Sequence, residues 1–139
     1  MSEREPVIVV EDRGEIVSRL QGQGVPYEDT FVATIEDARR ARADLRRFVR
    51  AELKRANRHD AAKLRQILLK ERLYLWHCGG FERSGGRYLH CSFVNSRESG
   101  DQLRQPRFPV ISDGGTDVGR CTYSLKSGQI VTIGWNSDG

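Results

Sequence analysis

Two of the three histidines stand next to cysteines, and these residue types are the first to consider for chemistry. The pairs are His77-Cys78 and His90-Cys91, and a further thiol follows at Cys121. Adjacent side chains in a strand point to opposite faces, so neither pair can chelate a metal alone. A structural zinc site takes about four ligands, and the chain lacks the C-x2-C spacing that many such sites use. We expect no metal, no cofactor, and thiols that are buried and reduced.

A small basic hydrolase, most specifically a ribonuclease, is the enzymatic interpretation of the second half of the chain. Cleavage of a phosphodiester needs a general base, a general acid and cations around one phosphate. Residues of those types in the predicted strands are His77, His90, Arg120 and Tyr123. Their spacing in the sequence does not show that they converge, so an enzyme is the alternative to a binding protein.

The most unusual feature of the composition is a dense run of Lys and Arg residues between positions 39 and 58. Nine of these twenty residues are Lys or Arg. The surrounding segment 36–72 carries thirteen cations against six acids, whereas segment 1–35 carries three against seven. Guanidinium forks match phosphates and carboxylates, so the run predicts contact with an acidic partner. The predicted binding residues are Arg39, Arg42, Arg46, Arg47, Arg50 and Lys54.

The leading hypothesis is a non-catalytic binding module that engages nucleic acid or an acidic protein through this Arg-rich helix. The competing explanation is a solvated helix face, on which cations pair with acids one turn away. Those acids are Glu36, Asp37, Asp44 and Glu52. A further interpretation is a small-ligand pocket between helices and sheet, lined by Tyr74, Trp76, Tyr123 and Trp135.

Residues 34–72 are expected to form the helical hairpin that presents these cations. The segment contains no Gly or Pro, and its apolar residues recur with the period of a helix. Thr34 and Asp37 resemble a capping pair at its start. A break is expected at residues 57–60, with Asp60 as the N-cap of the second helix. One continuous helix is the alternative.

After residue 72 the hydrophobic period changes to that of strands. Residues 73–78 and 88–93 alternate and predict a hairpin, joined by a long Gly-hinged loop over residues 79–86. A shorter strand is expected at residues 107–111, where Pro109 favours an edge position.

The last hairpin is expected from residues 118–125 and 129–135. Apolar and polar residues alternate in both strands, so one face of this sheet should rest on the helices. On the second strand that face is predicted to carry Val131, Ile133 and Trp135.

One α+β domain over residues 1–139 is the predicted architecture. Residues 1–33 supply a short strand, a short helix and a connection, residues 34–72 the basic helical hairpin, and residues 73–139 the sheet. The N-terminal strand and the hairpin are expected to pack on one face of a mainly antiparallel sheet of about 4–5 strands.

The apolar runs are too short to span a membrane. The run at residues 7–10 is also shorter than the core of a signal peptide. We therefore expect a cytoplasmic protein without membrane contact.

Overall fold

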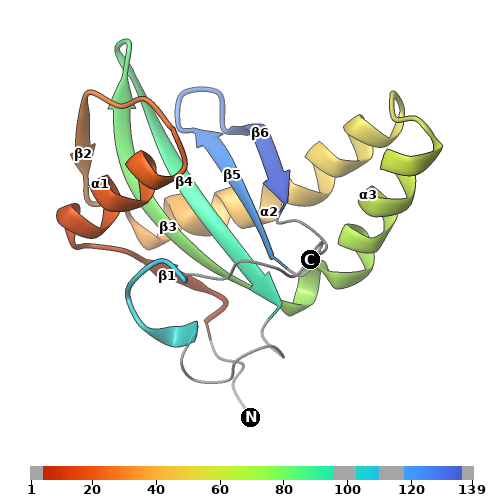
Figure 1. The fold of residues 1–139 in the computed structure, drawn as a ribbon, viewed down its shortest axis with the longest axis horizontal. Coiled ribbons are helices and arrows are strands. Elements are labelled where there is room, and N and C mark those ends of the chain that lie inside the picture. The colour runs from red at the N-terminus through yellow and green to blue at the C-terminus, as the bar shows by residue number, and fades with distance from the viewer. Residues whose placement is uncertain (1–4, 96–102, 110–117, 136–139) are drawn as a thin grey trace.

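The computed structural model describes residues 5–95, 103–109 and 118–135 (Figure 1). Its elements, in chain order, are β1 (Val7–Val9), α1 (Arg13–Gly22), β2 (Asp29–Phe31), α2 (Ile35–Leu53), α3 (Arg58–Lys70), the 3-10 helix η1 (Glu71–Leu73), β3 (Tyr74–Arg83), β4 (Gly86–Asn95), β5 (Val118–Ser124) and β6 (Gln129–Trp135). The sheet has the order β1-β3-β4-β5-β6, and β2 also pairs with β3. The α+β class predicted from the sequence is confirmed.

β1 and β2 share one edge of β3, which brings the sheet to six strands. β1 runs parallel to residues 76–78, and β2 runs antiparallel to residues 80–82. The pairs β3–β4, β4–β5 and β5–β6 are antiparallel. The sequence prediction placed the N-terminal strand against the sheet, whereas the structure builds it into the sheet.

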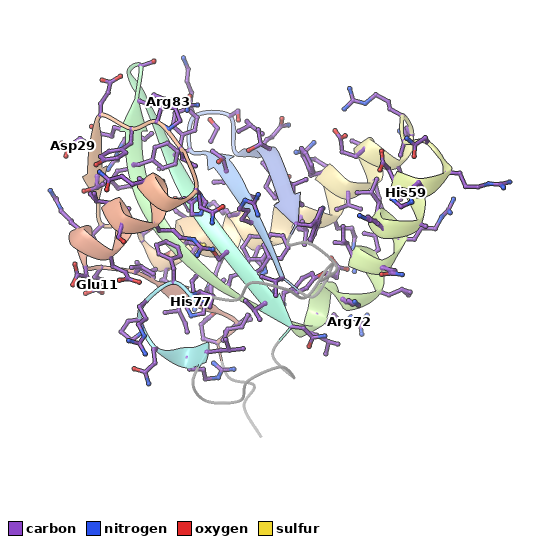
Figure 2. All side chains as sticks on the ribbon, in the orientation of Figure 1. Glu11, Asp29, His59, Arg72, His77 and Arg83 are labelled. Atoms are coloured by element: carbon purple, nitrogen blue, oxygen red, sulfur yellow. The ribbon has the colours of Figure 1, made fainter. Side chains whose placement is uncertain are left out.

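The helices cover both faces of the sheet. Figure 1 shows α2 crossing one face and α1 lying over the other. Tyr74, Trp76 and Cys78 alternate along β3 and pack in the large core beneath α2. The side chains between them, Leu75 and His77, belong to the α1 side, where Figure 2 shows His77 beneath α1. α2 therefore covers one face of the sheet, α3 packs against α2 on the β6 side, and α1 supplies a cover for the other face.

The hairpin α2–α3 begins each of its helices with a side-chain cap. The hydroxyl of Thr34 accepts a hydrogen bond from the backbone N–H of Asp37 at 3.1 Å, as predicted. The second cap is Asn57, whose Oδ1 accepts from the N–H of Asp60 at 2.8 Å. The prediction of Asp60 as N-cap was wrong, because the earlier of two good capping residues adopts the extended conformation that a cap requires.

The β3–β4 hairpin is longer than predicted, and the loop expected at residues 79–86 is wrong. β3 continues to Arg83, and the chain reverses at Ser84 and Gly85, with φ of 52° and 78°. Positive φ at both central residues is typical of a tight type I′ turn. Gly80 lies inside the strand, and the position needs glycine because a Cβ there would stand 2.5 Å from the ring of Phe31.

A β-bulge between β5 and β6 exposes Val131, which was predicted to face the helices. The register shifts at Thr122 and Tyr123, and Tyr123 pairs with Ile130. Ile130 is buried while Val131 is 47% exposed, so the prediction for Val131 was wrong. Ile133 and Trp135 pack against the core beneath the helices, as predicted.

The predicted strand at residues 107–111 is not formed where the structure can be described. Residues 107–109 are irregular, and residues 110 and 111 lie outside the described parts of the chain. Among the described residues, no helix is long and apolar enough to cross a membrane.

Candidate functional site

Three of the six predicted binding cations are paired with carboxylates of the same chain. The ion pairs along and beside α2 are Arg39 with Glu5 and Glu36, Arg40 with Asp37, Arg46 with Glu71, Arg47 with Asp44, and Arg55 with Glu52. This pairing is typical of a solvated helix face, and it reduces the charge available to a partner. Arg42, Arg50 and Lys54 make no ion pair with any described carboxylate.

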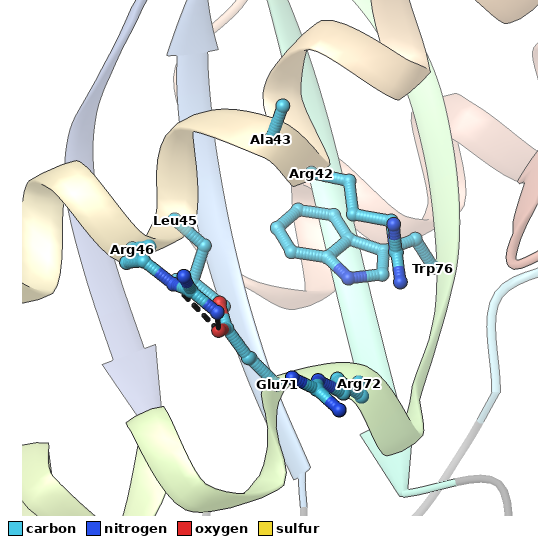
Figure 3. A pocket seen from close by; sticks show the side chains of 7 residues that line it. All are labelled: Arg42, Ala43, Leu45, Arg46, Glu71, Arg72 and Trp76. Atoms are coloured by element: carbon cyan, nitrogen blue, oxygen red, sulfur yellow. Dashed lines mark hydrogen bonds and ion pairs between the residues drawn. The ribbon is translucent and has the colours of Figure 1, made fainter.

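A pocket of about 290 Å³ opens where α2 faces the junction of η1 and β3. We call it the α2 pocket. Its lining residues are Arg42, Ala43, Leu45, Arg46, Glu71, Arg72 and Trp76 (Figure 3). Three of these seven residues are arginines and one is an acid, so the pocket carries a net positive charge.

Two buried hydrogen-bond donors in the α2 pocket have no acceptor among the described residues. They are Nε1 of Trp76 and Nε of Arg42. Figure 3 shows the nitrogen edge of Trp76 and the guanidinium groups of Arg42 and Arg72 around the same space, while Glu71 turns to Arg46. Buried donors normally have partners, because an unsatisfied one destabilises the fold. The pocket is therefore rich in donors and poor in acceptors, which favours an anion as its occupant.

The elements around the α2 pocket hold these donors in place. Trp76 is fully buried, and its ring stacks on Phe93 with the centroids 4.7 Å apart. Arg42 projects from the middle of α2, and η1 carries Glu71 and Arg72 toward the same pocket. Sequence reasoning missed Arg72, because only the turn between α3 and β3 brings it to α2.

A second hollow of about 470 Å³ continues along the exposed side of α2. It is lined by Ala43, Arg46, Arg47, Arg50, Ala51 and Lys54. Ala43 and Arg46 line both hollows, so the α2 pocket opens onto a basic surface that includes two of the unpaired cations.

The aromatic residues predicted to line a ligand pocket do not share one. Trp76 lines the α2 pocket, whereas Trp135 lines a separate groove between α3 and β6. Tyr74 and Tyr123 are buried in the core and line neither of these two hollows.

The four candidate groups for a hydrolase lie on both faces of the sheet. His90 lies on the α1 side, against Phe108, and His77 and Arg120 face the same side. Tyr123 faces the opposite side, where burial and the carboxylate of Asp44 raise its pKa. Arg120 and Tyr123 are three residues apart on one strand, and an odd spacing sends two side chains to opposite faces.

A cluster of polar groups nevertheless forms on the α1 side. We call Arg19, His90, Ser92 and Arg120 the sheet-face cluster. Arg19 reaches from α1 to donate to Oγ of Ser92 at 2.8 Å and to the carbonyl of Pro109 at 3.1 Å. Ser92 stands opposite Arg120 in the β4–β5 register. Arg19 was not predicted as a site residue, because nothing in its local sequence distinguishes it from a solvent-exposed helix cation.

Both histidines of the α1 side have lowered pKa values. Burial and the nearby charges of Arg19 and Arg120 lower the pKa of His90 to about 3. Burial also lowers the pKa of His77, while the backbone of Leu103 and Gln105 opposes the shift. His90 is therefore neutral near pH 7, so it is not a ready proton donor in the free protein.

No described group of three or more His, Cys, Asp or Glu residues is arranged to hold a metal ion. Comparisons with protein-family models, with curated proteins and with solved structures each found no match. Function is therefore inferred from the chemistry of the α2 pocket and of the sheet-face cluster.

Proposed function

We propose that this protein is a non-catalytic nucleic-acid-binding module that seats a backbone phosphate in the α2 pocket. The observation that carries the proposal is the pair of buried donors, Trp76 Nε1 and Arg42 Nε, that lack an acceptor among the described residues and lie beside a second cation, Arg72. A phosphate supplies several acceptor oxygens and a negative charge at once.

The surface next to the pocket favours a polymer over an isolated anion. The adjoining hollow places Arg50 and Lys54 beyond Arg46, along the exposed side of α2. A chain with one phosphate per nucleotide can reach these cations while one of its phosphates occupies the α2 pocket. Acidic side chains of a protein partner are the alternative, but one carboxylate has two coplanar oxygens and is satisfied by a single guanidinium fork.

Fluorescence anisotropy with short single-stranded RNA and DNA tests the proposal. Three to five phosphate contacts predict a log–log salt slope of about −2 to −4, at roughly −0.7 per contact on a single strand. The double variant Arg42→Gln/Arg72→Gln should weaken binding at least about tenfold, because charge-assisted hydrogen bonds are lost. Arg65→Gln is the matched control, since Arg65 is an exposed cation on α3 and lines neither hollow of the proposed surface.

Two outcomes contradict the nucleic-acid proposal. One is the absence of binding below about 100 µM at low salt, which is weaker than ordinary non-specific association. The other is equal weakening by the control and the double variant. Competition by polyglutamate but not by RNA would assign the surface to an acidic protein instead.

The hydrolase alternative receives less support from the site. Tyr123 is separated from His77, His90 and Arg120 by the sheet, and the low pKa of His90 leaves it neutral. RNA recovered after prolonged incubation should be intact. Cleavage that is lost in His90→Gln would reverse this preference and favour the ribonuclease.

A further inference from the structure

Arg19 and Arg120 both lie beside Ser92 on the α1 side: Arg19 donates to its Oγ at 2.8 Å, and Arg120 stands opposite it in the β4–β5 register. The charge of Arg120 lowers the pKa of Arg19, in addition to the larger effect of burial. Glu15 is the acid that opposes this shift, but its Oε1 already accepts from the backbone N–H of Phe108 at 3.1 Å. The guanidinium of Arg120 makes no hydrogen bond or ion pair with any residue of the described chain. The sheet-face cluster therefore carries uncompensated positive charge.

The cluster borders a hollow of about 150 Å³ between β5, β6 and the connection that follows α1. Its polar lining residues are His90, Arg120, Thr122 and Thr132. Thr122 and Thr132 stand opposite each other across β5 and β6, so two hydroxyl groups flank the hollow. Arg120 lies close over Gly134, where a Cβ would stand 3.1 Å from its Cζ. The small residue on β6 thus lets the guanidinium lie against the sheet.

His90 lines the hollow, and both nitrogens of its imidazole ring lack a hydrogen-bond partner among the described residues. Its side chain is 2% exposed. A neutral imidazole has one donor and one acceptor nitrogen, and leaving both unpaired in a buried position destabilises the protein. A ligand in the hollow would satisfy at least the donor.

We propose that the sheet-face cluster is a second anion site, in which Arg120 and His90 bind a phosphoryl group and Arg19 adds positive charge nearby. Donors from β4, β5 and β6 line the hollow, and such a set suits a tetrahedral anion with several oxygens better than a planar carboxylate. The volume of about 150 Å³ is below the 300 Å³ or so typical of pockets for drug-sized ligands. The site therefore takes free phosphate or the terminal phosphate of a small molecule, and it lies across the sheet from the α2 pocket.

Inorganic phosphate is the probe, and amide NMR of the full chain is the measurement. The experiment uses Arg42→Gln/Arg72→Gln protein, so that binding in the α2 pocket does not contribute and the two proposals fail independently. Saturable shifts are expected at the amides of Ser92, Thr122 and Gly134. Arg120→Gln should weaken binding about 10- to 100-fold through loss of a charge-assisted hydrogen bond. A parallel titration with methyl phosphate distinguishes a phosphomonoester from the free ion.

Arg13→Gln is the matched control, because Arg13 is an exposed cation on the same helix as Arg19. It should leave the affinity unchanged. Arg19→Gln should also weaken phosphate binding. Because this substitution removes the hydrogen bonds to Ser92 and Pro109, it can prevent folding, and in that case Arg120→Gln alone decides the result. Absence of saturable shifts up to about 10 mM phosphate, or equal affinity in Arg120→Gln, overturns the proposal.

Discussion

The backbone N–H of Ile130 in β6 donates a hydrogen bond to the Asp44 carboxylate on α2 at 2.7 Å. The same carboxylate accepts from Arg47 through both of its oxygens, at 2.6 and 2.8 Å. Asp44 therefore joins the last strand of the sheet to the helix that covers it. This bond lies beside the bulge at Val131, where the β5–β6 ladder is interrupted and a backbone N–H needs another acceptor.

Asp44→Ala should lower the free energy of unfolding by about 1.5–3 kcal/mol, because it leaves the N–H of Ile130 without its charged acceptor. Urea unfolding at neutral pH measures this loss. The control is Glu52→Ala on the same helix, which removes only a surface pair with Arg55 and should have little effect. Equal losses in the two variants would show that Asp44 acts only through a surface ion pair.

His90 should make stability fall as the pH is lowered. Its pKa is about 3 in the folded protein and about 6.5 when unfolded. Between these values the unfolded chain binds more protons, so the stabilising effect of a neutral His90 is full above pH 6.5 and is lost progressively below it. The slope from this residue approaches about 1.4 kcal/mol per pH unit.

Urea unfolding of the native protein and of His90→Gln at pH 7.5 and 4.5 measures this contribution. Lowered carboxylate pKa values, such as that of Glu5 beside Arg39, act in both proteins and cancel in the comparison. The native protein should lose more stability than the variant between the two pH values. The same loss in both would mean that His90 is not buried as described.

The thiols of Cys78, Cys91 and Cys121 lie opposite one another across β3, β4 and β5. All three are free and buried, as predicted from the sequence. Burial and hydrogen bonding among them raise the pKa of Cys91 well above its usual value. A thiol reagent should therefore react slowly with the native protein and quickly in urea. Fast reaction of all three thiols before unfolding would contradict this placement.

The fold was predictable where local pattern and tertiary packing agree. The cap at Thr34 and the alternation of Tyr74 and Trp76 in β3 both follow from neighbouring residues alone. The prediction was wrong at Gly79 and Gly80, because two consecutive glycines in a sequence indicate a loop. In the structure they are strand residues, and both positions need glycine because Ile16 of α1 and Phe31 of β2 lie close to where a Cβ would be. That close packing involves distant parts of the chain.

The candidate sites were less predictable, because their parts come from separate elements. The run of arginines in α2 was visible, but its carboxylate partners Glu5 and Glu71 lie in distant segments. Strand alternation alone separates Tyr123 from Arg120, and that signal was present in the sequence. Nothing local predicts that Arg19 and Arg120 lie near each other, because helix α1 and strand β5 meet only in the folded chain.

Trp76 should report directly on the occupancy of the α2 pocket. The chain contains two tryptophans, so Trp135→Phe leaves Trp76 as the single indole emitter. A phosphate that accepts a hydrogen bond from Nε1 should shift its emission to longer wavelength, because the excited indole N–H is a stronger donor.

Fluorescence titration of Trp135→Phe with single-stranded RNA measures this shift, and Arg42→Gln/Arg72→Gln in the same background should abolish it. A second protein, Trp76→Phe, keeps Trp135 in the groove beside α3 and should show no shift. If RNA binds by anisotropy while the emission of Trp76 stays constant, the polymer lies on the outer surface of α2 and the pocket is empty. A shift produced by polyglutamate but not by RNA would assign the pocket to the side chain of an acidic protein.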